Sequence, residues 1–171
     1  MKRTLLAFII GFMLLPWKGQ AQTDYAAGTR VGNSTGFSMR YFKDEDMVIE
    51  GLLTFRHGGI QVTGIWERYR PLFNIPGGDI TIYYGLGGHI GINRWAGFFG
   101  NTDLARNKYY IPSIGVDGML SFNYELSNIP LSLSLDYKPY AGLFEPNFLA
   151  IHGGDMAVAI RYHFNLPYKP F

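Results

Sequence analysis

The chain has 171 residues, of which 47% are hydrophobic and only 16% are charged, against about 25% charged in ordinary soluble domains. It contains no cysteine, which excludes disulfides, thiolate metal sites and a cysteine nucleophile. Its 15 Lys and Arg against 13 Asp and Glu indicate no nucleic-acid-binding surface. The length suits one domain, and the many glycines and aromatics with few charges favour short strands with an unusually apolar outer surface.

Residues 1–21 have the layout of a secretory signal peptide. A basic start precedes an apolar run from Leu5 to Leu15, which is shorter than the ~20 residues that span a bilayer. Small residues before position 22 predict cleavage after Ala21. Cleavage takes three of the 15 basic residues and leaves 12 against 13 acidic ones in the exported domain, 22–171.

From residue 25 onward, apolar and polar residues alternate with a period of two, which indicates β-strands, and no segment has a helical period. Turn sequences such as "NIPGGD" at 74–79 separate the alternating segments. The pattern predicts strands at about 25–32, 36–43, 46–56, 59–71, 79–93, 111–124, 130–140 and 155–165.

These strands predict an all-β fold, an eight-stranded antiparallel up-and-down barrel, for which two versions remain open. A soluble periplasmic barrel buries its apolar face, whereas a transmembrane barrel turns that face outward to lipid. Long apolar faces and aromatics near the strand ends favour the transmembrane version. Both termini would then lie in the periplasm, and the longest connections, 94–110 and 139–154, would lie outside the cell.

The polar faces carry nearly balanced charges, as a narrow lumen requires because each buried charge needs a partner. The pairs expected there join Arg30, Arg40 and Arg161 to Glu50, Glu67, Asp117 or Asp136. The full predicted lumen network is Arg30, Arg40, Glu50, Arg56, Glu67, His89, Asp117, Asp136, Arg161 and His163. A conducting pore is a weaker interpretation, since side chains nearly fill the interior of an eight-stranded barrel.

The cluster "GLGGHIG" at 85–91 invites a nucleotide-binding interpretation, which its spacing contradicts. Gly85 and Gly87 supply G-x-G, but Ile occupies position 90, and neither a helix nor Lys-Ser/Thr follows. Alternation instead places His89 and the odd-numbered glycines inside, where we expect the glycines to leave room for bulky side chains. No pattern indicates a cofactor, and the histidines lack metal-site spacing.

Aromatic and basic residues occur together in and beside the connection 94–110. This combination suits a protein partner or lipopolysaccharide phosphates, although contact of the aromatics with the outer leaflet is the favoured interpretation. The candidates for surface binding are Arg94, Trp95, Phe98, Phe99, Arg106 and Lys108.

Short motifs are spread over the exported domain: Glu50-Gly51, His57-Gly58-Gly59, Thr63-Gly64, "YYGLGGHIG" at 83–91, "GVDG" at 115–118, "LSLDYKP" at 133–139 and "IRYHF" at 160–164. By these motifs the chain resembles the small eight-stranded outer-membrane barrels of Gram-negative bacteria, and more narrowly those of unassigned function. The resemblance implies a monomer in the outer membrane, in contact with lipid and lipopolysaccharide, with a structural or surface-binding role and no evident chemistry. It also implies that the outer-membrane assembly machinery recognises the aromatics Tyr162 and Phe164 of the last strand.

The same resemblance raises an enzymatic alternative, because some eight-stranded barrels modify lipid A. The deacylase type has a His-x-Ser arrangement near its last strands, whereas here Ile151-His152-Gly153-Gly154 has no such serine. A set of Ser134, His163 and Asp136 is conceivable, but a triad requires contact between nucleophile and base. The sequence therefore predicts no catalytic residue.

Overall fold

The computed structural model describes residues 25–44, 46–56, 59–95, 109–143 and 149–164, and the regular elements in these ranges are all β-strands. The strands are β1 (Tyr25–Gly32), β2 (Thr35–Asp44), β3 (Met47–Arg56), β4 (Gly59–Ile75), β5 (Gly78–Trp95), β6 (Tyr109–Leu126), β7 (Leu131–Leu143) and β8 (Leu149–Phe164). Within these ranges, no helix is long and apolar enough to cross a membrane. The predicted signal peptide, 1–21, lies outside the described residues.

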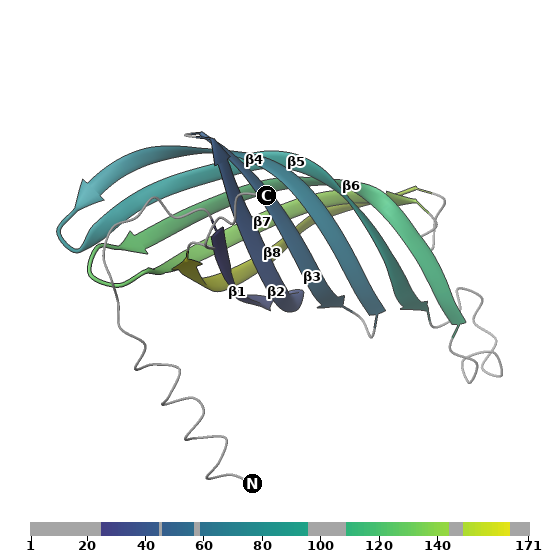
Figure 1. Ribbon diagram of the computed structural model, residues 1–171. Helices are drawn as coiled ribbons and strands as arrows, with labels where there is room; N and C mark the ends of the chain where they lie inside the picture. The colour runs from purple at the N-terminus through teal and green to yellow at the C-terminus, as the bar shows by residue number, and fades with distance from the viewer. Residues whose placement is uncertain (1–24, 45, 57–58, 96–108, 144–148, 165–171) are drawn as a thin grey trace, which may run out of the picture.

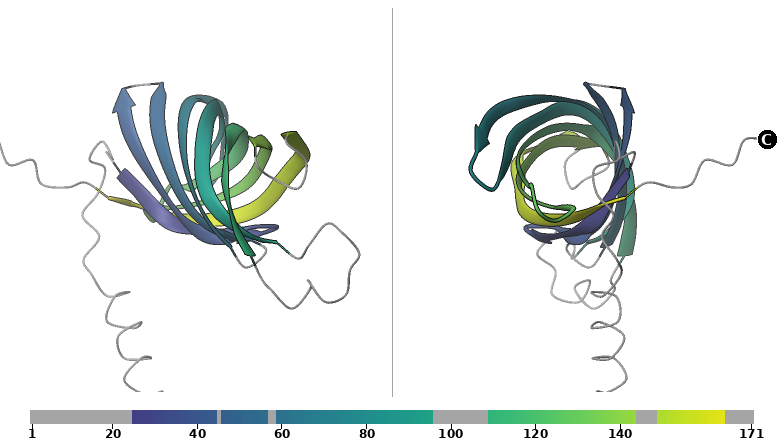
Figure 2. Two further views of the ribbon diagram at one scale, coloured as in Figure 1. Left: turned by 90° about the vertical axis from the view of Figure 1, so that its right-hand side faces the viewer. Right: turned by 60° about the vertical axis from the view of Figure 1, so that its left-hand side comes forward.

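The eight strands form a closed barrel in which each strand pairs antiparallel with its neighbours in sequence (Figures 1 and 2). The ladder between β1 and β8 closes the barrel and runs from Tyr25 opposite Phe164 to Gly32 opposite Ala157. Closure leaves the first and last strands without a free edge over this ladder. The predicted eight-stranded up-and-down antiparallel barrel is confirmed.

The strands are longer than predicted where the chain forms the two longest connections. The β5–β6 ladder continues to Trp95 opposite Tyr109, and the β7–β8 ladder continues to Leu143 opposite Leu149. The predicted ends were wrong because backbone pairing extends these hairpins beyond the clear side-chain alternation. Pro139 lies within β7 and is accommodated at a register shift between Lys138 and Tyr140.

At the opposite end of the barrel, β4 and β5 extend beyond their neighbour β3 (Figure 1). The ladder between β3 and β4 ends at Met47 opposite Arg68, whereas β4 and β5 stay paired to Ile75 opposite Gly78. A register shift between Pro71 and Phe73 carries β4 past its proline. The predicted end at residue 71 was therefore wrong as well.

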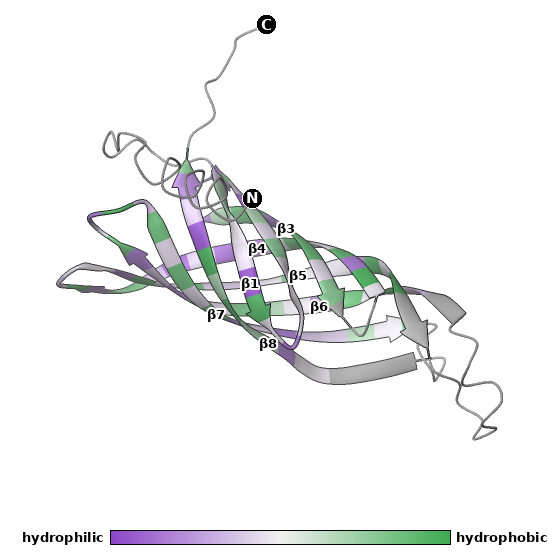
Figure 3. Cartoon of the chain, turned by 90° about the horizontal axis from the view of Figure 1, so that it is seen from below, coloured by the Kyte–Doolittle hydropathy of each residue, from purple (hydrophilic) through white to green (hydrophobic). Residues whose placement is uncertain are grey.

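Hydrophilic and hydrophobic residues alternate along the strands (Figure 3), and the exposure of their side chains separates an apolar outer face from a polar inner face. Along β5, Leu86 is 76% exposed and Ile90 is 62% exposed, whereas Tyr83 and His89 are buried. Large hydrophobic side chains are exposed on all eight strands, while most buried side chains are polar or charged. The inner apolar cluster is small and consists of Leu52, Ile65 and Met119.

Glycines on the inner face of β5 allow neighbouring backbones to approach closely. A Cβ atom at Gly87 would lie 2.1 Å from the carbonyl oxygen of Gly64, and one at Gly85 would lie 2.1 Å from that of Trp66. The expectation that these glycines leave room for bulky side chains is therefore corrected, because neighbouring backbone occupies that space. The absence of a Cβ lets β5 curve tightly against β4 in a narrow barrel.

We expect Gly87→Ala to destabilise the barrel by about 1–3 kcal/mol, because the β4 backbone must shift to accept the methyl group. Gly64→Ala is the matched control on the paired strand, since a Cβ there meets nothing within 4 Å. Urea unfolding of both variants followed by tryptophan fluorescence measures the difference. Equal midpoints for the two variants would contradict the close approach.

The charged interior as candidate functional site

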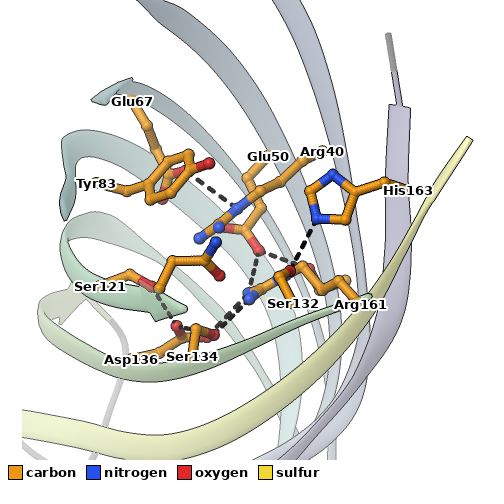
Figure 4. A network of polar contacts seen from close by, with 12 residues as sticks. Arg40, Glu50, Glu67, Tyr83, Ser121, Ser132, Ser134, Asp136, Arg161 and His163 are labelled. Carbon is orange, nitrogen blue, oxygen red and sulfur yellow. Dashed lines mark hydrogen bonds and ion pairs between the residues drawn. The ribbon is translucent and has the colours of Figure 1, made fainter. Parts of the chain in front are cut away.

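Arg40 lies at the centre of the polar network inside the barrel (Figure 4). It lies directly opposite Glu50 in the β2–β3 ladder, and its Nη2 is 3.1 Å from Glu50 Oε2. Its Nε is 3.4 Å from Glu67 Oε2 on β4. The guanidinium carbon also lies 4.1 Å from the centroid of the Tyr83 ring on β5, a cation–π contact. One arginine therefore connects four consecutive strands.

Arg161 reaches the same cluster from β8. Its Nη2 lies 2.8 Å from Glu50 Oε1 and 2.9 Å from Asp136 Oδ2. Its Nε donates a hydrogen bond of 2.7 Å to Ser38 Oγ, and its Nη1 donates to Ser134 Oγ. Charge-assisted bonds of this kind are about twice as strong as neutral ones. Arg161 therefore joins β8 to β2, β3 and β7 through the lumen.

Serine hydroxyls complete the coordination of the buried carboxylates. Ser121 Oγ and Ser134 Oγ donate to Asp136 Oδ1 over 2.6 and 2.8 Å, and Ser38 Oγ donates to Glu50 Oε1 over 2.6 Å. The Ser134 hydroxyl also accepts from Arg161, so this serine belongs to the polar network. Buried carboxylates with several donors avoid the desolvation penalty of an unpaired charge.

The prediction of lumen pairing was right for Arg40 and Arg161 and wrong for Arg30. Arg30 Nη2 lies 3.6 Å from Asp155 Oδ2 on β8, and the backbone amide of Ser34 donates to Asp155 Oδ1 at 3.1 Å. Alternation identifies which side chains point inward, but it does not give their height along a sheared barrel. Asp155 has the inward parity of β8, so the same pattern could have identified it.

Asp117 was also predicted to pair with an arginine, and the structure gives it other partners. Lys138 Nζ lies 2.7 Å from Asp117 Oδ1, and His89 Nδ1 lies 2.6 Å from Asp117 Oδ2. Lys138 shares the inward parity of Asp136 on β7, a signal that the predicted network omitted. Among the described side chains, the buried charged set is therefore Arg30, Arg40, Lys138 and Arg161 with Glu50, Glu67, Asp117, Asp136 and Asp155.

The conceivable Ser134–His163–Asp136 set does not assemble. His163 Nε2 lies 2.9 Å from Ser132 Oγ, whereas Ser134 donates to Asp136 and accepts from Arg161. Ser132 lies opposite Arg161 in the β7–β8 ladder, which brings it rather than Ser134 near the end of β8. Among the described residues, no group of three or more potential His, Asp or Glu ligands could hold a metal ion.

The predicted surface-binding and assembly residues have different outcomes. Arg94 and Trp95 belong to β5 rather than to a loop, which corrects the prediction, because they pair with Tyr110 and Tyr109. The side chains of Arg56, Arg94 and Trp95, and all of Phe98, Phe99, Arg106 and Lys108, lie outside the described residues. On β8, Tyr162 is exposed, and its ring stacks 6.4 Å from Phe164, which in turn stacks 5.9 Å from Tyr25.

No protein-family model, no curated protein and no solved structure matches this chain.

Proposed function

We propose that this chain is a small integral outer-membrane β-barrel protein with a structural or surface-binding role. The observation that carries the proposal is the polarity of the barrel. Charged and hydroxyl-bearing side chains are buried inside, and large apolar side chains are exposed on every strand. A transmembrane barrel needs an apolar outer band and tolerates a polar interior.

The apolar outer face argues against the alternative of a soluble periplasmic barrel. Monomeric soluble proteins rarely expose contiguous apolar patches larger than a few hundred Å². Here Val62 and Trp66 on β4 are followed on β5 by Leu86 and Ile90, each more than half exposed. In water such a face would drive aggregation, whereas in lipid it is the stable surface.

The charged interior supports a structural or binding role over a transport role. Arg40 and Arg161 link strands across the lumen through Glu50, and Asp136 joins the same cluster. Ions would have to break these pairs to pass, at a cost of several kcal/mol. Contact with lipid and lipopolysaccharide then falls to the outer face and to the ends of the longest hairpins, which include Arg94 and Trp95.

Cell fractionation tests this location directly. We expect the chain to sediment with outer membranes and to show heat-modifiable migration on gels, because a lipid-stabilised barrel resists detergent until it is boiled. Recovery in the soluble periplasmic fraction would overturn the proposal. Purified barrel in a planar bilayer should give no steady conductance, and regular single-channel steps would favour a pore instead.

A further inference from the structure

A second polar cluster lies on β5 and β6, which run side by side (Figure 1). His89 Nδ1 lies 2.6 Å from Asp117 Oδ2, and His89 Nε2 lies 3.3 Å from Ser113 Oγ. All three side chains are buried. An imidazole is thus held between a carboxylate and a serine hydroxyl, which is the relation of base to orienting acid and nucleophile in serine hydrolases.

The strand register creates this arrangement. His89 lies directly opposite Gly115, and Ser113 and Asp117 lie two residues on either side of that glycine on the same inward face. A Cβ atom at Gly115 would lie 2.6 Å from His89 Cε1, so the glycine is required for the imidazole to lie over β6. The His89 ring can then contact both Ser113 and Asp117, which lie on either side of Gly115.

Hydrogen-bond chemistry fixes the roles of the two imidazole nitrogens. An ionised carboxylate only accepts hydrogen bonds, so Nδ1 carries the proton that it donates to Asp117. In the neutral ring Nε2 then accepts from the Ser113 hydroxyl, as a general base must. The Tyr140 ring packs edge-on against His89, with ring centroids 5.7 Å apart, and limits rotation of the imidazole.

Two free donors lie in the same cross-strand rows as these residues. Gln61 lies opposite Gly91, which lies opposite Ser113, and Thr63 lies opposite His89. Gln61 Nε2 and Thr63 Oγ1 are buried and have no hydrogen-bond partner within the described part of the chain. Because Gly91 carries no side chain, nothing from β5 itself fills the row between the Gln61 amide and Ser113. Unsatisfied buried donors are costly, and such donors stabilise an oxyanion in acyl transfer.

We propose that Ser113, His89 and Asp117 form a serine-hydrolase site inside the barrel that cleaves short-chain carboxylic esters, with Gln61 as the oxyanion donor. Ser113 is the nucleophile, His89 is the general base and acid, and Asp117 is a positioning residue. This activity is additional to the structural role and does not depend on it. A short acyl chain is required because an eight-stranded lumen admits at most one small ligand.

The reaction consumes one ester and one water. Ser113 Oγ attacks the carbonyl carbon and its proton moves to His89 Nε2, while the Gln61 amide donates to the oxyanion. The ester C–O bond then breaks, and the leaving alkoxide takes the proton from Nε2 as the alcohol. Water next gives a proton to Nε2 and its oxygen attacks the acyl carbon. Collapse releases the carboxylic acid and returns the proton to Ser113.

A fluorophosphonate reagent tests the nucleophile in the full-length folded barrel. The P–F bond breaks as Ser113 Oγ forms a P–O bond, so one phosphonyl group per chain, located by mass spectrometry of peptides, is the expected result. The native chain should also hydrolyse p-nitrophenyl acetate at least 100-fold faster than the p-nitrophenyl palmitate ester. Absence of phosphonylation, or phosphonylation at a different serine, would overturn the proposal.

Matched variants separate catalysis from folding, with heat-modifiable migration used to select folded samples. Ser113→Ala should abolish labelling and lower acetate-ester hydrolysis at least 100-fold. Ser132→Ala should leave both unchanged, because that serine contacts His163 and lies outside the proposed site. Gln61→Ala should lower kcat about 100-fold with little change in KM. Retained hydrolysis in Ser113→Ala would reject the assignment.

The role of Asp117 is tested against its ion pair with Lys138. Lys138→Met removes the contact of 2.7 Å to Asp117 Oδ1 and leaves the His89 contact in place. Asp117→Asn removes the acceptor that fixes the imidazole tautomer, so we expect at least a 100-fold loss of kcat with KM unchanged. Lys138→Met should lose less than tenfold. Equal losses in the two variants would mean that Asp117 only balances charge, and the positioning role would be rejected.

Discussion

Arg161→Met is expected to destabilise the barrel by about 3–5 kcal/mol, the usual loss when one partner of a buried ion pair is removed. Arg161 contacts both Glu50 and Asp136, each within 2.9 Å, and donates to Ser38 and Ser134. Methionine fills part of the volume but leaves Asp136 without its guanidinium partner. Guanidinium chloride unfolding in lipid vesicles, followed by tryptophan fluorescence, measures the loss.

Two further variants test whether the loss of stability in Arg161→Met comes from the broken ion pair. Arg161→Lys keeps the charge but cannot bond to four groups at once, so we expect an intermediate loss. The double variant Arg161→Met with Asp136→Leu removes the orphaned carboxylate and should recover part of the stability, since apolar replacements of buried pairs are often neutral. A double variant less stable than the sum of the single losses would contradict the ion-pair explanation.

The period-two pattern predicts the faces of the strands well because each inward position is fixed by its neighbours two residues away. Glu50, Asp136 and Arg161 were all assigned to the lumen, and all three are buried. Alternation carries no information on the stagger between neighbouring strands, which is the shear of the barrel. It therefore does not predict at which position along the barrel axis two inward-facing groups meet. The pairing of Arg30 with Asp155 was not predicted for this reason.

The Ser113–His89–Asp117 cluster was not predicted for the same reason. Each residue has inward parity in the sequence, but the register that places His89 opposite Gly115 is a property of the β5–β6 ladder. The set that seemed conceivable from the sequence was Ser134, His163 and Asp136, but the β7–β8 ladder brings Ser132 rather than Ser134 to His163. Which side chains meet across neighbouring strands is therefore decided by the strand register, which only the structure shows.

The second large loss of stability is expected for a substitution on the outer surface of the barrel. Leu86→Arg is expected to destabilise the barrel by about 2–4 kcal/mol in lipid vesicles, the cost of an arginine facing the middle of a bilayer. Leu86 lies midway along β5 and is 76% exposed, so the substitution removes little internal packing. On a water-exposed surface the same change usually stays within about 0.5 kcal/mol. The free energy of unfolding in vesicles therefore distinguishes a surface that faces lipid from one that faces water.

Asn128→Arg is the matched control, because Asn128 is exposed in the turn between β6 and β7 and lies off the apolar belt. We expect it to leave the free energy of unfolding unchanged while it adds the same charge. Leu86→Glu should cost less than Leu86→Arg, as acidic residues do on the lipid face of barrels. If Leu86→Arg and Asn128→Arg had the same small effect, the outer face of β5 would be in contact with water, and the membrane location would have to be abandoned. A loss confined to Leu86→Arg would instead tie the exposed apolar belt directly to lipid.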